Sequence, residues 1–153
     1  MMKAITRLAA FTVGVTALTV SAFASAPAGW STNLDEAFAK AKAENKHVLV
    51  EFTGSDWCPP CIFLSKNVLS KKEFIEPASK NFILVELDFP HGDEALAKKN
   101  EPFAEKYGIE GFPTIVLFTP EGKEFNRFFA TGIAKPEEML AVLDMALERK
   151  DLD

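Results

Sequence analysis

Long apolar runs and helix-spaced apolar residues alternate along the chain, and they predict an alternation of strands and helices. Buried strands are expected at residues 47–52, 82–88 and 114–118, where apolar side chains follow one another with few polar interruptions. A turn at 120–123 follows the third of these runs. Residues 124–130 are therefore predicted to form its hairpin partner.

The segments between these strands have the spacing and the capping residues of helices. Asn33 can cap a helix that runs to about residue 44. Ser70 and Glu73 have the spacing of a capping box, which predicts that a helix restarts there, before Pro77. Further helical segments are expected after residue 61, over 93–107 with a break near Asn100-Glu101-Pro102, and from Pro136 to about 149. This order predicts an α/β fold with a mixed sheet and helices on both faces.

The first residues have the layout of a secretory signal peptide. Lys3 and Arg7 precede an uncharged apolar stretch that is too short for a stable membrane span, although an uncleaved anchor is the alternative. Small residues favour cleavage after Ala24, or else after Ala26. Residues 1–24 are therefore predicted to be a signal peptide and residues 25–153 one domain. The domain would work in the periplasm or outside the cell, where disulfides persist.

The charge balance narrows the class of partner. The whole chain has a net charge of −5, and removing Lys3 and Arg7 would make it about −7. A negative domain is a poor match for nucleic acid or for an anionic lipid surface. We therefore expect contact with a membrane only through the transient signal peptide.

The chain has two cysteines, and both lie in the segment Trp57-Cys58-Pro59-Pro60-Cys61. A C-x-x-C pair at a strand-to-helix junction is typical of redox proteins, in which one thiolate attacks a disulfide and the second sulfur resolves the mixed disulfide. A structural disulfide and half of a metal site are the alternatives. Zinc would need more soft ligands, whereas Cu(I) could accept two thiolates. His47 and His91 are distant in sequence and are interpreted as surface or loop residues.

Two motifs at a characteristic separation resemble the thioredoxin-like superfamily. Glu51-Phe52 followed by residues 57–61 is similar to the strand and active-site loop of that family, and residues 107–118 are similar to its cis-proline segment. Gly132 lies where the family has a glycine after the hairpin. The lead-in at 54–57 is most similar to secreted bacterial members, near the C-terminal domain of the thiol:disulfide interchange protein. The resemblance implies a thioredoxin fold over roughly residues 34–147 and no cofactor beyond the cysteines.

The resemblance assigns expected roles to the catalytic residues. Cys58 would lie before the first turn of its helix, where free N–H groups favour a thiolate, and Cys61 would be the more buried resolving sulfur. Glu51 would be a buried acid that takes the proton of Cys61, the alternative being a strand-end glutamate turned to solvent. The family often has a lysine near that acid, whereas this chain has Glu86. Ile62 also replaces a family lysine.

A second group of residues is expected to bind the substrate. Pro113, if cis as in the family rather than trans, would leave the backbone of Phe112 free to pair with an extended substrate. Trp57 would shield the site and offer a contact face, unless it is a plain core residue. The remaining docking surface would come from Pro59, Pro60 and Ile62.

These observations predict a periplasmic or secreted thiol:disulfide oxidoreductase that acts on protein thiols and disulfides. Pro59 and Pro60 lack N–H donors, so the Cys58 thiolate would be less stabilised and the couple less oxidising. The protein would then reduce or isomerise disulfides and be recharged by a membrane-bound redox partner. A redox-inert adaptor or chaperone and a disulfide-introducing oxidant are the alternatives.

Overall fold

A four-stranded mixed sheet forms the centre of the molecule. The structure, a computed structural model, describes residues 27–152, so the predicted signal peptide and its cleavage sites lie outside the described residues. The strands are β1 (His47–Thr53), β2 (Phe82–Asp88), β3 (Thr114–Phe118) and β4 (Glu124–Phe129), in the order β2-β1-β3-β4. β1 and β2 are parallel, while β3 is antiparallel to both β1 and β4. The predicted mixed sheet is confirmed.

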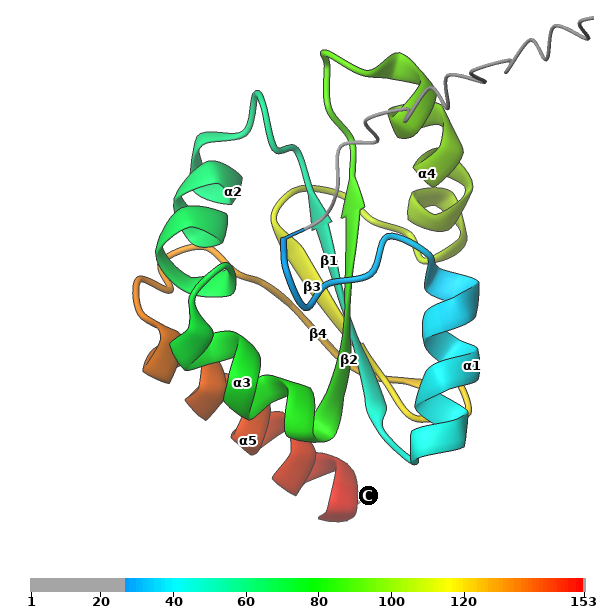
Figure 1. The fold of residues 1–153 in the computed structure, drawn as a ribbon, viewed down its shortest axis with the longest axis vertical. Coiled ribbons are helices and arrows are strands. Elements are labelled where there is room, and N and C mark those ends of the chain that lie inside the picture. The colour runs from blue at the N-terminus through cyan, green and yellow to red at the C-terminus, as the bar shows by residue number, and fades with distance from the viewer. Residues whose placement is uncertain (1–26, 153) are drawn as a thin grey trace, which may run out of the picture.

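Helices cover the sheet on both faces (Figure 1). The helices are α1 (Leu34–Glu44), α2 (Pro59–Leu64), α3 (Lys72–Asn81), α4 (Glu94–Lys106) and α5 (Pro136–Leu152), and a π-helical turn, η1 (Ser65–Leu69), joins α2 to α3. α2, α3 and α5 lie on one side of the sheet, and α1 and α4 lie on the other (Figure 1). No helix within residues 27–152 is long and apolar enough to cross a membrane.

The alternation of side chains along the strands divides the core into two layers. Leu49 and Leu84 belong to the layer that packs with residues of α3 and α5, whereas Val50 and Val85 belong to the layer under α1. Because side chains two residues apart share a face of a sheet, Glu51 and Glu86 point toward the same side as Leu49 and Leu84.

The structure corrects two of the predicted helix details. α4 is continuous through Pro102. Pro102 has no N–H to donate to the carbonyl of Lys98, but both residues lie on the exposed side of the helix, where water can reach that carbonyl. The predicted capping box is also absent: α3 begins after Lys71 without a side-chain cap. Ser70 instead ends η1, with its N–H donating to the carbonyl of Ser65.

A short segment before α1 pairs with the outer edge of β2. The N–H of Ser31 donates to the carbonyl of Leu84 at 2.8 Å, and the N–H of Glu86 donates to the carbonyl of Ser31 at 2.9 Å. Trp30 is buried beside Phe74, and its indole N–H donates to the carbonyl of Leu69. This segment is therefore part of the folded domain.

Candidate active site

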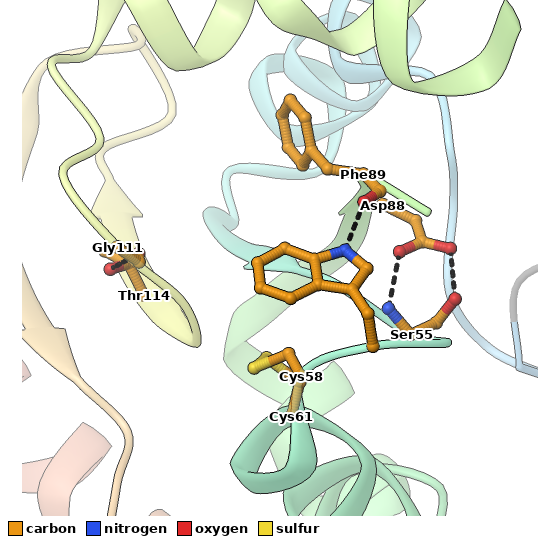
Figure 2. The surroundings of a disulfide bond; sticks show 8 residues. Ser55, Cys58, Cys61, Asp88, Phe89, Gly111 and Thr114 are labelled. Atoms are coloured by element: carbon orange, nitrogen blue, oxygen red, sulfur yellow. Dashed lines mark hydrogen bonds between the residues drawn. A yellow bond between two sulfur atoms is a disulfide. The ribbon is translucent and has the colours of Figure 1, made fainter. Parts of the chain in front are cut away.

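Cys58 and Cys61 form a disulfide at the start of α2 (Figure 2). Cys58 is the N-cap residue, in an extended conformation, and Pro59 and Pro60 are the first two helical residues, where a missing N–H costs nothing. The exposed fraction of Cys58 is 4%, and that of Cys61 is 0%. Cys58 is therefore slightly more exposed than Cys61, and it lies at the positive end of the helix.

Two carboxylates hold the loop that leads into the disulfide. Asp88, at the end of β2, accepts hydrogen bonds from the backbone N–H of Ser55 at 2.9 Å and from its hydroxyl at 2.5 Å (Figure 2). Asp56 accepts bonds from the N–H groups of His91 and Gly92 at 2.9 and 2.7 Å. These four bonds tie the loop after β1 to the chain that follows β2.

The ring of Trp57 packs against the chain that follows β2. Its indole N–H donates to the carbonyl of Phe89 at 2.7 Å, and its ring stacks on His91 with centroids 4.8 Å apart and planes at 5°. The exposed fraction of Trp57 is 39%, so it is not a plain core residue. Gly54 lies beneath the ring, where a Cβ would come within 2.5 Å of the indole, so the ring's position requires glycine.

His91 is a residue of this site that the sequence did not identify. It is exposed in a loop, as predicted, but the loop brings it against Trp57 beside the disulfide. The one signal in the sequence was Asp56, a residue type that often accepts hydrogen bonds from backbone N–H groups in loops. Only the fold shows that its partners are His91 and Gly92. His47 lies at the far end of β1, between the rings of Phe82 and Phe125, and burial lowers its pKa.

The peptide bond between Phe112 and Pro113 is cis, as the resemblance implied. Pro113 is buried, and Phe112 is half-buried against the rings of Trp57 and Phe89. The hydroxyl of Thr114 donates to the carbonyl of Gly111 at 2.7 Å, which fixes the turn before β3. The predicted contact residues Trp57 and Phe112 therefore lie together.

Glu51 is buried on the face of β1 that also carries Leu49, with an exposed fraction of 1%. Its Oε1 atom has no hydrogen-bond partner. Burial raises the pKa of Glu51 well above its usual value, and the negative charges of Glu86 and Asp88 raise it further, while the Thr53 hydroxyl partly offsets them. The alternative of a strand-end glutamate turned to solvent is therefore wrong. Burial, with Asp88 as a smaller cause, raises the pKa of Glu86 to about 7.

Apolar side chains are exposed around the disulfide. Pro59, Pro60 and Ile62, all predicted to bind substrate, are exposed on the first turn of α2. Phe63 is exposed on the same helix and was not identified from the sequence, because an aromatic residue near the start of a helix usually indicates core packing. Over the described part of the chain, no group of three or more His, Cys, Asp or Glu side chains is arranged to hold a metal ion.

Two curated relatives match more than half of this chain. Disulfide bond reductase DsbH of Chlamydia pneumoniae is 37% identical over 95 residues, which are 60% of this chain and 57% of that protein. Thiol:disulfide interchange protein DsbD 2 of Pseudomonas aeruginosa is 30% identical over 116 residues, which are 76% of this chain and 19% of that protein. The chain thus spans less than two thirds of the length of each relative.

Solved structures agree with the sequence relatives. A DsbH oxidoreductase superimposes with a TM-score of 0.69 at 29% identity, covering 89% of this chain and 95% of that one. A thioredoxin from Thermus thermophilus, at 24% identity and a TM-score of 0.60, shows the same fold over 77% of this chain and 85% of its own. The sequence model of the thioredoxin-like domain family matches residues 34–147 of this chain, which run from the start of α1 into α5. The chain therefore belongs to the thioredoxin-like domain family.

Proposed function

We propose that the protein is a thiol:disulfide oxidoreductase that exchanges disulfides with other proteins through Cys58 and Cys61. The observation that carries this proposal is the disulfide itself, placed at the N-terminus of α2 with exposed apolar side chains around it. The relatives named for disulfide reduction and interchange support it. A purely structural disulfide needs neither the helix N-terminus nor an apolar surround.

The reaction begins with both cysteines reduced. The Cys58 thiolate attacks a disulfide of the substrate, which forms a mixed disulfide and releases the first substrate sulfur as a thiolate. Cys61 then loses its proton to the Glu51 carboxylate and attacks the Cys58 sulfur. The bond between the two cysteines forms, the bond to the substrate breaks, and the second substrate sulfur leaves as a thiolate that takes a proton from water. Two electrons have passed from the enzyme to the substrate.

The substrate is proposed to be an extended protein segment. The backbone of Phe112 would pair with it in the manner of an added strand, while Trp57, Pro59, Pro60 and Ile62 would contact its side chains. Pro113 is buried, so its part would be to shape this edge rather than to touch the substrate. The mixture of apolar contacts and backbone pairing would suit partly unfolded proteins.

We further propose a periplasmic or extracellular location and the reducing or isomerising direction. The signal-peptide pattern of residues 1–24 supports the location. Pro59 and Pro60 support the direction, since neither has an N–H to stabilise the Cys58 thiolate. In an oxidising compartment such a protein needs a source of electrons, and a membrane-bound redox partner would supply them.

Reduction of insulin by dithiothreitol tests this function. The protein is expected to accelerate precipitation of the insulin B chain, and the acceleration should vanish in Cys58→Ser. A redox-inert adaptor, the other candidate favoured by the exposed apolar residues, would bind unfolded insulin chains equally well with and without the Cys58 sulfur. Equal behaviour of the wild-type protein and Cys58→Ser would therefore reject the oxidoreductase.

A further inference from the structure

Two acids, the buried Glu51 and the half-buried Glu86, are neighbours across the parallel pair β1–β2. Glu51 is the register partner of Glu86 in this ladder, and Ile115 is its partner on the other side. Directly paired residues of neighbouring strands point to the same face of a sheet. The same face carries Leu49 and Leu84 and packs with the core that includes Leu64 of α2. Glu51 thus has an apolar neighbour on one flank and a carboxyl neighbour on the other.

Glu51 is almost completely shielded from solvent. Its side chain is 1% exposed, and one carboxyl oxygen lacks any hydrogen-bond partner. A group that accepts a proton from Cys61 must later release that proton, or the next cycle finds it already protonated. The release needs a second group that borders both Glu51 and a water-accessible space.

Glu86 is such a group. It lines a cavity of about 190 Å³ together with Cys61, Thr53 and Ser65, below the disulfide. It also lines a second cavity of about 250 Å³ together with Asp88 and Asn100. Both spaces have room for water and polar side chains in their walls, Ser65 in the first and Asn100 in the second, so Glu86 borders solvent-accessible space in each of them.

We propose that Glu86 is a positioning residue that acts through Glu51: its charge sets when Glu51 holds a proton, and its carboxylate passes that proton between Glu51 and the water of the cavities. This role rests on the proposed exchange reaction. The proton of Cys61 moves first to Glu51, then to ionised Glu86, and then to water. No electrons move in this relay, and the substrate thiolate takes its proton from the solvent separately.

Burial, with the negative charge of Asp88 as a smaller cause, brings the ionisation of Glu86 into the neutral range. Glu51 lies beside it on β1, Asp88 follows it by two residues on β2, and Lys66 of η1 borders the same cavity as Cys61. The Asp88 carboxylate already accepts two hydrogen bonds from Ser55. The pKa of Glu86 is raised to about 7, so its charge appears near neutral pH, and that charge raises the pKa of Glu51.

Stopped-flow reaction with 5,5′-dithiobis(2-nitrobenzoate) tests the proposal. With equimolar reagent, reduced protein should release nitrothiobenzoate in two phases: a concentration-dependent attack by Cys58 and a concentration-independent resolution by Cys61. Both phases are measured from pH 5.5 to 9.5 in wild type, in Glu86→Gln, in Glu51→Gln and in the double variant. Glu105→Gln is the matched control, because this exposed glutamate lies on α4, on the other side of the sheet.

In Glu86→Gln, the plot of the resolving rate against pH should lose its inflection near pH 7. The remaining midpoint should move down by about one pH unit, because a negative neighbour of Glu51 is lost. Glu86→Lys, which reverses the charge, should move it further down and serves if Glu86→Gln folds poorly. The phase of Cys58 and the Glu105→Gln profile should match wild type. In the Glu51→Gln background, Glu86→Gln should have no further effect.

Two results would overturn the inference. One is a wild-type profile in Glu86→Gln or Glu86→Lys. The other is a full effect of Glu86→Gln when Glu51 is already Gln, which would mean that Glu86 does not act through Glu51. Neither depends on insulin turnover, so failure of the proposed function would show in the insulin assay alone, whereas failure of this inference would show only in the resolving phase.

Discussion

Ser55 donates two hydrogen bonds to Asp88, one from its backbone and one from its hydroxyl, across 33 residues of sequence. Ser55→Ala removes the hydroxyl bond and leaves the backbone bond in place. We expect a loss of about 1 kcal/mol in the free energy of unfolding, since the bond is charge-assisted but exposed. Urea denaturation measures it.

The control for this change is Ser70→Ala. The Ser70 hydroxyl contacts only the carbonyl of Lys66, at 3.5 Å, and its loss should change stability by less than about 0.5 kcal/mol. Equal effects of the two variants would show that the bond to Asp88 does not stabilise the loop.

The two cysteines should give different results when each is replaced by serine on its own. Cys61→Ser is expected to accumulate mixed disulfides with substrates, because the attacking Cys58 remains at the N-terminus of α2. Cys58→Ser should trap none, since Cys61 is fully buried. Non-reducing gels and mass spectrometry of trapped adducts measure this. Alkylation of Cys61 before Cys58 at neutral pH would reverse the assignment.

Glu51 is expected to assist proton transfer in the resolving step. Glu51→Gln should slow that step by roughly tenfold to a hundredfold, toward the lower end of general acid–base effects. The concentration-independent phase of thiol release measures it. If the rate were the same as wild type throughout pH 6 to 9, Glu51 would have no part in the reaction.

The raised pKa values of the two acids predict that the protein loses stability as pH rises. In the unfolded chain Glu86 releases its proton near pH 4.5, whereas in the folded protein it keeps it up to about 7. The folded state therefore binds more protons between these values, and stability falls across that window. The loss should reach about 3 kcal/mol for Glu86 at pH values well above 7. Glu51 extends it to higher pH.

Urea unfolding at pH 5 and pH 8 measures this dependence. Glu86→Gln should flatten it, because the amide does not titrate, and should be more stable than wild type at pH 8. Glu105→Gln should keep the wild-type slope. A wild-type protein that is more stable at pH 8 than at pH 5 would contradict the prediction.

The reduction potential should lie near the reducing end of the range. We expect a value nearer to about −270 mV than to about −120 mV, because two prolines stand where N–H donors could stabilise the Cys58 thiolate. Pro60→His, which adds a positive charge between the cysteines, should make the couple more oxidising. Equilibration with glutathione measures both. A wild-type value above about −150 mV would indicate a disulfide-introducing enzyme.

Local sequence signals predicted the strands, the helices and the cysteine pair, since each depends on residues close together in the chain. They failed where the environment decides. A proline inside a helix leaves a carbonyl of the preceding turn unpaired, and α4 tolerates Pro102 because that side of the helix is exposed, which is a tertiary property. The capping box predicted at Ser70 does not form, because Ser70 ends the π-helical turn η1. No periodicity in the sequence indicates that turn.

The site shows the same limit. The sequence placed Glu51 near the cysteines but left its burial open, because burial depends on the helix that covers β1. The resemblance already implied that Glu86 lies near this acid, and the strand register makes the two residues direct partners. His91 joins Trp57 across a loop whose path is set by hydrogen bonds to Asp56, and neither spacing nor composition indicates that path.

The backbone pairing of Ser31 with β2 affects how the domain can be trimmed. The family match begins at Leu34, so a recombinant fragment cut to the matched range would lack both Trp30 and Ser31. Such a fragment would leave the free edge of β2 open to strand addition by another copy and would hollow the core beside Phe74. Self-association of that fragment would reflect the position of the cut rather than a property of the natural domain.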